Sequence, residues 1–173
     1  KSVLDQLKTA PKAIILDTMN FWMDTALEDL KSVIRRVNII VINDEEAKQL
    51  SGKESLLDAA EEIQKFGLKY IIIKKGEHGA MLFGENQHFN LPAFPVKDVI
   101  DPTGAGDTFA GGLAGFLSEC KEISFESLKT AMEYGTVMAS FCVEKFGTLS
   151  MENLKKQEFI NRLNLFKSTQ KKP

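Results

Sequence analysis

Short apolar runs alternate with stretches of helical periodicity along the chain. An apolar run that ends in a polar side chain is typical of a buried strand, whereas apolar residues spaced three or four apart predict an amphipathic helix. This pattern predicts strands at 13–17, 38–43 and 70–73, and helices at 25–36, 44–50, 56–66, 125–143 and 153–166. Because strands and helices alternate, we expect an α/β fold with a largely parallel sheet.

Three local expectations depend on a few side chains. Asp24 is placed to cap the helix that begins at Thr25. The segment 87–100 predicts irregular strands, because two prolines interrupt it. Phe21 and Trp22 are expected to pack in the core, with stacking on a ring as the alternative.

Composition and charge narrow the class of protein. The chain has 173 residues, 43% of them apolar and 27% charged, which is ordinary for a globular domain with its own core. A formal net charge of −2 argues against a nucleic-acid-binding protein. No run is as long as a membrane helix and the start does not resemble a signal peptide, so we expect a cytoplasmic protein. Cys120 and Cys142 are expected as small buried residues in a reducing compartment.

The stretch Asp101–Gly112, DPTGAGDTFAGG, predicts a tight turn that runs directly into a helix. The backbone N–H groups of Gly104, Ala105 and Gly106 would then be free at a helix N-terminus, where they form an anion site. Asp107 lies in the same first turn. An anion hole beside a potential base suits phosphoryl transfer to a hydroxyl, while the alternative is a structural turn with an Asp that only stabilises the helix dipole.

Two other phosphate-binding motifs are excluded by counting. A dinucleotide-binding G-x-G-x-x-G that starts at Gly104 would need glycine at 109, where Phe109 stands. A P-loop needs Gly-Lys followed by Ser or Thr, but Gly52-Lys53 is followed by Glu54. The failed dinucleotide pattern disfavours an NAD-dependent oxidoreductase.

Polar residues follow several of the predicted strands. Asp17, Asn43 and Lys74 each come directly after an apolar run, and the turn at Asp101 follows the irregular strands. In parallel sheets, ligands bind at the carboxyl ends of the strands. We therefore expect these residues to crowd one edge of the sheet.

Three short motifs follow one another along the chain. They are an N-x-x-E at Asn43–Glu46, a strand followed by a glycine-containing loop at Ile73–Gly79, and DVIDPTGAGDTF at Asp98–Phe109. Together they resemble the ribokinase-like (PfkB) family of carbohydrate and nucleoside kinases, and the resemblance covers essentially the whole chain. It implies a ribokinase-like three-layer α/β fold, in which residues 1–173 form a single α/β domain, the C-terminal nucleotide-binding and catalytic part. The family's N-terminal part and its β-sheet lid are missing from this chain.

The resemblance also implies a reaction. The intact protein would be an ATP-dependent kinase acting on a hydroxymethyl group of a sugar or nucleoside. Asp107 would be the general base, and Gly104, Ala105 and Gly106 the anion hole. Asn43 and Glu46 would organise Mg²⁺ and phosphate, with Glu46 reaching the metal through water. Their alternatives are a helix cap for Asn43 and a solvated helix position for Glu46.

Further residues match nucleotide-binding positions of the family. Lys74, Gly76 and Gly79 would line the nucleotide, although the two glycines could equally serve a simple turn and the lysine could face solvent. Thr136 aligns with a position that contacts the base or ribose, while a mid-helix threonine is more often a packing residue. Asp17 occupies a loop near the phosphates in relatives.

Many relatives bind a monovalent cation beside the anion hole, and the resemblance implies a K⁺ site here. Asp101 and Thr103 match the loop that supplies ligands. Carbonyl oxygens are expected from the segment that holds Cys142, Lys145 and Gly147. Met151 stands where some relatives offer a hydroxyl group.

The chain begins with Lys rather than Met, so we expect it to be the C-terminal portion of a longer protein. The residues that select the acceptor would then lie upstream. The expected partner is a small sugar or nucleoside, not a nucleic acid or a membrane, and the intact protein is expected as a homodimer. The alternative function is a non-catalytic nucleotide-binding module, either a pseudo-kinase or an inactive fragment.

Overall fold

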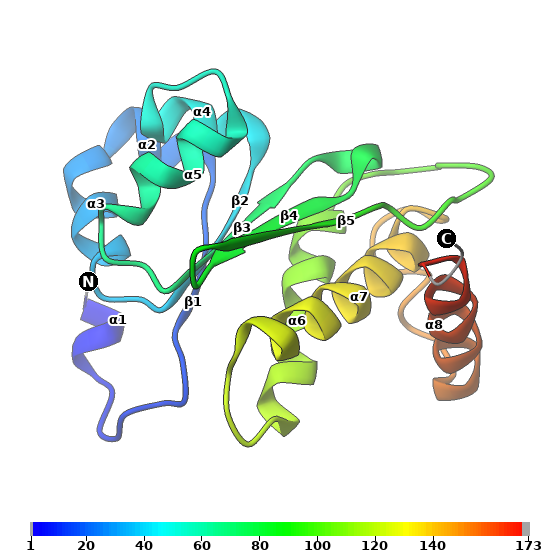
Figure 1. Cartoon of the computed structure of the whole chain (residues 1–173). Coiled ribbons are helices and arrows are strands. Elements are labelled where there is room, and N and C mark those ends of the chain that lie inside the picture. Colours follow the sequence, from blue (N-terminus) through cyan, green and yellow to red (C-terminus); the bar gives the residue numbers. More distant parts are fainter. Residues whose placement is uncertain (1, 171–173) are drawn as a thin grey trace. The chain divides into compact units, whose positions relative to one another are not determined.

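The computed structural model describes residues 2–170 of the chain (Figure 1). Its contacts divide the chain into two compact units, which are described separately below. The first unit holds the residues up to 76 together with 81–90, and the second holds 77–80 and the residues from 91 onward. The expectation of a single domain over 1–173 stays a prediction.

A five-stranded sheet with the order β1-β2-β3-β4-β5 organises the first unit. Its strands are β1 (Ile15–Asp17), β2 (Ile39–Asn43), β3 (Tyr70–Lys74), β4 (Ala80–Gly84) and β5 (Gln87–Leu91). β1 pairs with β2, and β2 with β3, in parallel, as the sequence predicts. The apolar residues of β2 and β3 are buried without alternation, because a strand covered on both faces has no solvent side.

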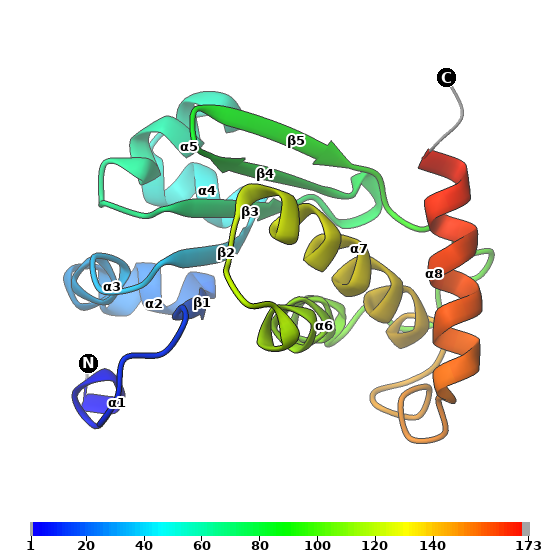
Figure 2. The same ribbon diagram turned by 60° about the horizontal axis from the view of Figure 1, so that its bottom comes forward.

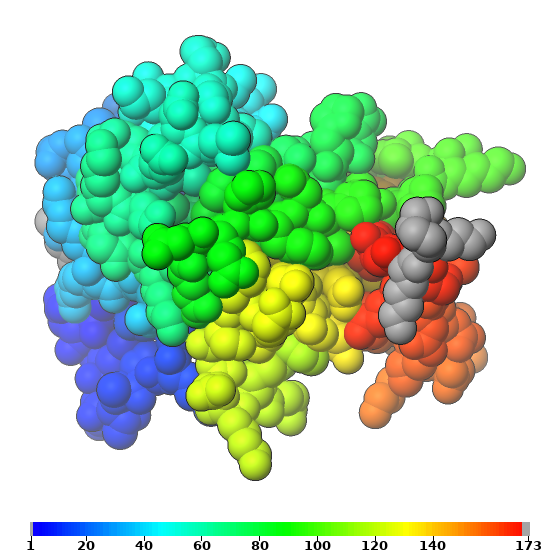
Figure 3. Space-filling model, in the orientation of Figure 1, coloured from blue at the N-terminus to red at the C-terminus, as the bar shows by residue number. Residues whose placement is uncertain are grey.

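β4 and β5 form a hairpin that sequence analysis did not resolve. The expected irregular segment 87–100 begins with a regular strand, β5. Glu85 and Asn86 connect the two strands with φ of 53° and 59°, the left-handed backbone that two-residue hairpin turns need. The prolines follow β5, so they end the strand and do not interrupt it. The tip of the hairpin is exposed, and its green atoms lie at the surface in Figure 3.

The helices of the first unit are α1 (Ser2–Asp5), α2 (Asn20–Thr25), α3 (Leu27–Ile34), α4 (Asp44–Ser51) and α5 (Leu56–Gln64). The predicted helix 25–36 is in fact two helices, so the prediction that Asp24 caps it is wrong. Asp24 lies inside α2 and accepts a hydrogen bond from Gln49 Nε2 at 2.7 Å. The break falls at Ala26, which precedes α3 with an extended φ of −148° and no side-chain cap.

Phe21 and Trp22 are not core residues. Their side chains are 53% and 48% exposed, and their rings contact each other edge to face at 5.1 Å. Both belong to α2, whose one buried residue is Met23. The expectation of core packing was therefore wrong: only one position of this short helix turns inward.

Three helices make up most of the second unit: α6 (Ala105–Glu119), α7 (Phe125–Cys142) and α8 (Lys156–Gln170). The start of α8 lies three residues after the predicted one, behind a series of turns. α6 and α7 lie side by side (Figures 1 and 2). A Cβ atom at Gly135 would lie 2.7 Å from the Phe109 carbonyl oxygen, so the absence of a side chain lets the backbones approach closely.

Side-chain caps fix the beginnings of several helices. Ser124 and Ser127 form a reciprocal capping box at the start of α7, and Ser55 caps α5. Gly52 ends α4 in the left-handed conformation, with φ of 69°. None of the helices within residues 2–170 combines the length and apolar character needed to cross a membrane.

Candidate active site

Residues that follow the parallel strands of the first unit converge, as expected. Asp17 ends β1, Asn43 ends β2 and Lys74 ends β3, and the register places Asn43 opposite Lys74. The Lys74 ammonium reaches Asp17 Oδ1 at 3.0 Å, and the two side chains are only 18% and 27% exposed. Lys74 is therefore held at this edge of the sheet by an ion pair.

Asn43 and Glu46 form a capping box at the start of α4. Asn43 Oδ1 accepts the Glu46 N–H at 2.7 Å, and Glu46 Oε2 accepts the Asn43 N–H at 3.0 Å. Asn43 is thus a helix cap, as one alternative held. Glu46 is only 4% exposed, so it is not the solvated helix residue of the other alternative.

The Glu46 carboxylate has a further donor that the sequence did not reveal. The Thr18 hydroxyl, which follows β1, donates to Glu46 Oε2 at 3.1 Å. The Thr18 N–H in turn donates to Asp17 Oδ1 at 3.0 Å. No sequence signal could have found this pair, because 28 residues separate Thr18 from Glu46.

The Glu46 carboxylate keeps one oxygen that could bind a metal-held water. The hydrogen bonds from Thr18 and Asn43 both fall on Oε2, and Oε1 accepts none from residues 2–170. That stretch holds no group of three or more His, Cys, Asp or Glu side chains that could bind a metal directly. Mg²⁺ keeps several waters and needs few protein carboxylates, so Glu46 fits a metal held through water and by phosphate oxygens.

The glycine turn of the second unit leads into α6. Gly104 is its N-cap, with φ of 79°, a conformation that favours glycine. The Ala105 N–H donates to the Pro102 carbonyl at 3.1 Å, which corrects the expectation that all three N–H groups are free. Those of Gly104 and Gly106 donate to no acceptor among residues 2–170.

Asp107 lies in the first turn of α6 and is exposed. Within residues 2–170 its carboxylate has no hydrogen-bond or ion-pair partner. A carboxylate with these properties can accept a proton from a bound hydroxyl group without first breaking a protein contact. The turn therefore presents a free acceptor beside unpaired N–H donors.

Asp101 joins the turn to the segment after α7. Its Oδ1 accepts the Thr103 N–H at 2.9 Å and its Oδ2 accepts the Gly147 N–H at 3.3 Å. The Thr103 side chain and N–H, and then the Gly147 N–H, hold the pKa of the Asp101 carboxyl below its ordinary value. The structure thus brings Asp101, Thr103 and Gly147 together, and their role in binding K⁺ stays a prediction.

Cys142, the last residue of α7, contacts the turn. Its thiol donates to the Thr103 carbonyl at 3.6 Å, and its sulfur would lie 3.9 Å from a Cβ atom at Gly104. Cys142 is buried as expected, whereas Cys120 is only partly buried. The end of α7 is therefore part of the support of the turn.

The remaining predicted nucleotide-binding residues have clear structural surroundings. Gly76 and Gly79 have φ of 54° and 85°, and a Cβ atom at Gly79 would lie 2.0 Å from the Leu91 carbonyl oxygen. Both glycines thus serve a turn, and Gly79 also permits a close backbone contact. Thr136 is buried within α7. Their roles in nucleotide binding stay predictions.

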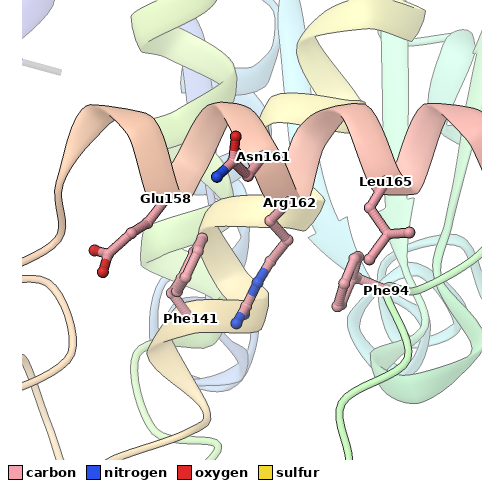
Figure 4. A pocket seen from close by; sticks show the side chains of 6 residues that line it. All are labelled: Phe94, Phe141, Glu158, Asn161, Arg162 and Leu165. Atoms are coloured by element: carbon pink, nitrogen blue, oxygen red, sulfur yellow. The ribbon is translucent and has the colours of Figure 1, made fainter.

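A separate cluster of side chains surrounds Arg162 in the second unit, apart from the three sequence motifs. The Arg162 guanidinium lies 3.5 Å from the ring centroid of Phe141 and 5.1 Å from that of Phe94 (Figure 4). It also donates to both carboxylate oxygens of Glu144 at 3.0 Å. Phe94, Phe141 and Arg162 border an open pocket of about 470 Å³. Arg162 belongs to α8, Phe141 belongs to α7 and Glu144 follows α7, so these contacts hold α8 against the end of α7.

Comparison with known proteins places the chain in a family. The sequence model of the pfkB family of carbohydrate kinases matches residues 2–155. The chain therefore belongs to this family, which confirms the resemblance carried by the three motifs.

Named relatives in the family are carbohydrate and nucleoside kinases. A cytidine kinase of Thermococcus kodakarensis is 35% identical over 112 residues, which cover 60% of this chain and 40% of the relative. An aminoimidazole riboside kinase of Salmonella typhimurium is 32% identical over 152 residues, which cover 86% of this chain and 45% of the relative. The chain thus spans about half the length of these relatives or less.

Solved structures confirm the ribokinase-like α/β fold. Aminoimidazole riboside kinase from Salmonella enterica, complexed with aminoimidazole riboside and an ATP analogue, matches with a TM-score of 0.73 and 28% identity. The match covers 89% of this chain and 52% of that structure. Ribokinase from Thermotoga maritima gives a TM-score of 0.74 at 25% identity and covers 94% and 52%.

Proposed function

We propose that the chain is the nucleotide-binding and catalytic part of an ATP-dependent kinase that phosphorylates a hydroxymethyl group of a sugar or nucleoside. The observation that carries this proposal is the free, exposed Asp107 carboxylate in the first turn of α6. It is next to the unpaired N–H of Gly106, in a turn whose sequence resembles the family's signature. The kinase names of the relatives support the same class of reaction.

In the proposed reaction the acceptor hydroxyl oxygen attacks the γ-phosphorus of ATP. The new P–O bond forms as the bond between the γ-phosphorus and the bridging oxygen breaks, and ADP leaves. Asp107 accepts the proton of the attacking hydroxyl. The N–H groups of Gly104 and Gly106 neutralise charge on the phosphoryl oxygens, with Ala105 fixing the turn through its bond to Pro102.

Residues of the first unit are proposed to bind the nucleotide. Asn43 orients Glu46, and Glu46 would hold Mg²⁺ through water, while Lys74 would provide positive charge for phosphate. Mg²⁺, when bound, neutralises charge on the phosphate oxygens. Asp101 and Thr103 are proposed to hold K⁺ beside the turn.

The acceptor is proposed to be a small sugar or nucleoside because the relatives bear such names. The matches cover less than half of these relatives, so the choice among their acceptors is left to the test below. A homodimer of the intact protein and a cytoplasmic location remain predictions.

The test is a phosphorylation panel on the intact protein with Mg²⁺·ATP and with ribose, fructose, cytidine and aminoimidazole riboside as acceptors. We expect formation of ADP that depends on one of these acceptors, together with a phosphorylated product. ATP binding without transfer to any member of a wide panel would favour the alternative, a non-catalytic nucleotide-binding module. That alternative applies with more force to the present chain alone, since it spans about half of the solved relatives.

A further inference from the structure

The Glu46 carboxylate receives one hydrogen bond more than its helix needs. The capping box with Asn43 is complete in both directions without any other residue. The additional donor is the Thr18 hydroxyl, which comes from the loop after β1 and bonds the same oxygen, Oε2, at 3.1 Å. A residue from a different element therefore fixes the orientation of this carboxylate.

Two donors on one oxygen have a directional consequence. They hold Oε2 toward the Asn43 N–H and the Thr18 hydroxyl, so rotation of the carboxylate would break both bonds. Oε1 is then the oxygen that keeps its lone pairs for a further ligand. Glu46 is only 4% exposed, and a nearly buried carboxylate oriented by charge-assisted bonds keeps one geometry.

Thr18 is itself held in place. Its N–H donates to Asp17 Oδ1 at 3.0 Å, and the same oxygen accepts from the Lys74 ammonium at 3.0 Å. A continuous chain of bonds thus runs from Lys74 through Asp17 and Thr18 to Glu46. All of these residues belong to the first unit.

From this network we infer that Thr18 is a positioning residue, which orients Glu46 so that its Oε1 can hold a water molecule of nucleotide-bound Mg²⁺. The inference rests on the proposed function, since it assigns Thr18 a task in the binding of Mg²⁺·ATP. A purely structural reading would have Thr18 do no more than satisfy a buried carboxylate. The two readings differ in whether the hydroxyl matters more when the metal is present.

The test measures the affinity of the 173-residue chain for ATP with and without Mg²⁺, by titration calorimetry. Thr18→Val removes the hydroxyl group with little change in shape, and Thr18→Ser keeps it. Thr25→Val is the matched control, because the Thr25 hydroxyl donates to the carbonyl of Phe21, within α2. Thermal melting of each variant reports whether it folds.

We expect Thr18→Val to reduce the gain in affinity that Mg²⁺ provides by about tenfold, the size of one lost bond to a charged group. Affinity for metal-free ATP should change by less than about twofold, and Thr18→Ser and Thr25→Val should match the wild type. If Thr18→Val does not fold, Thr18→Ala takes its place, and the same ratio of ATP affinity with Mg²⁺ to that without Mg²⁺ is measured.

The outcomes separate the two proposals. Parallel losses of affinity with and without Mg²⁺, or no loss in Thr18→Val, would overturn the positioning role and leave the proposed function standing. A wild-type chain that binds no ATP under either condition would overturn the nucleotide-binding function assigned to the chain, and the role of Thr18 with it.

Discussion

The contact between α6 and α7 gives a sharp prediction for Gly135→Ala. An added Cβ atom would lie 2.7 Å from the carbonyl oxygen and 3.0 Å from Cδ2 of Phe109. The carbonyl is helix backbone and cannot rotate away, so the helices must separate. Overpacking of this kind costs about 1–3 kcal/mol, and replacing glycine in a helix interior returns about 1 kcal/mol. We expect a net loss of up to about 2 kcal/mol in the free energy of unfolding.

Gly115→Ala is the matched control for this experiment. Gly115 is exposed in the middle of α6, and a Cβ atom there would meet nothing within 4 Å. The control should therefore stabilise the chain by about 0.5–1 kcal/mol through helix propensity alone. Urea unfolding followed by far-UV circular dichroism measures both variants. If Gly135→Ala proves as stable as Gly115→Ala, the close approach of the two helices is refuted.

Two further predictions concern the turn and its support. Gly104→Ala should lower the free energy of unfolding by about 1 kcal/mol, because alanine is strained at positive φ, and a stability equal to the wild type would contradict the left-handed N-cap. Asp101→Asn should destabilise the chain at neutral pH, since the hydrogen bonds that lower the Asp101 pKa favour the folded state only while the carboxyl is ionised. The stabilising contribution of the ionised carboxyl is complete above the ordinary pKa of 3.8 and is lost as the pH falls through the lower pKa of the folded state. The stabilities of wild type and variant should therefore converge in acid. A difference that stays constant with pH would argue against the pKa shift.

The sequence predicted the elements whose signal is local. β2 and β3 are uninterrupted apolar runs, and both were found within one residue of their expected ends. The turn before α6 was also found as expected, and Asn43 caps α4, as one of its two alternatives held. Such a cap is a local feature, because the capping side chain and its partner lie three residues apart.

The features that sequence analysis missed depend on residues far apart in the chain. Thr18 meets Glu46 across 28 residues, and Arg162 meets Glu144 across 18, and neither spacing carries a pattern. The exposure of Phe21 and Trp22 was missed for a related reason. Neighbouring aromatic residues predict a buried position, and only the packing of their short helix shows which of its side chains face solvent. The Asp24 cap failed because the chain breaks at Ala26 without any glycine or proline.

The most direct test of the central claim is the turnover of Asp107→Asn in the intact protein. Asparagine keeps the size of the side chain but cannot accept the proton of the attacking hydroxyl. Glu119→Gln, at the other end of α6, is the matched control for loss of one exposed carboxylate from this helix. Loss of a general base typically lowers the rate by about 10²–10⁴-fold, so we expect kcat to fall within this range while the control keeps wild-type turnover. A fall of less than about tenfold, or ~1.4 kcal/mol of barrier, would contradict the assignment of Asp107 as the base.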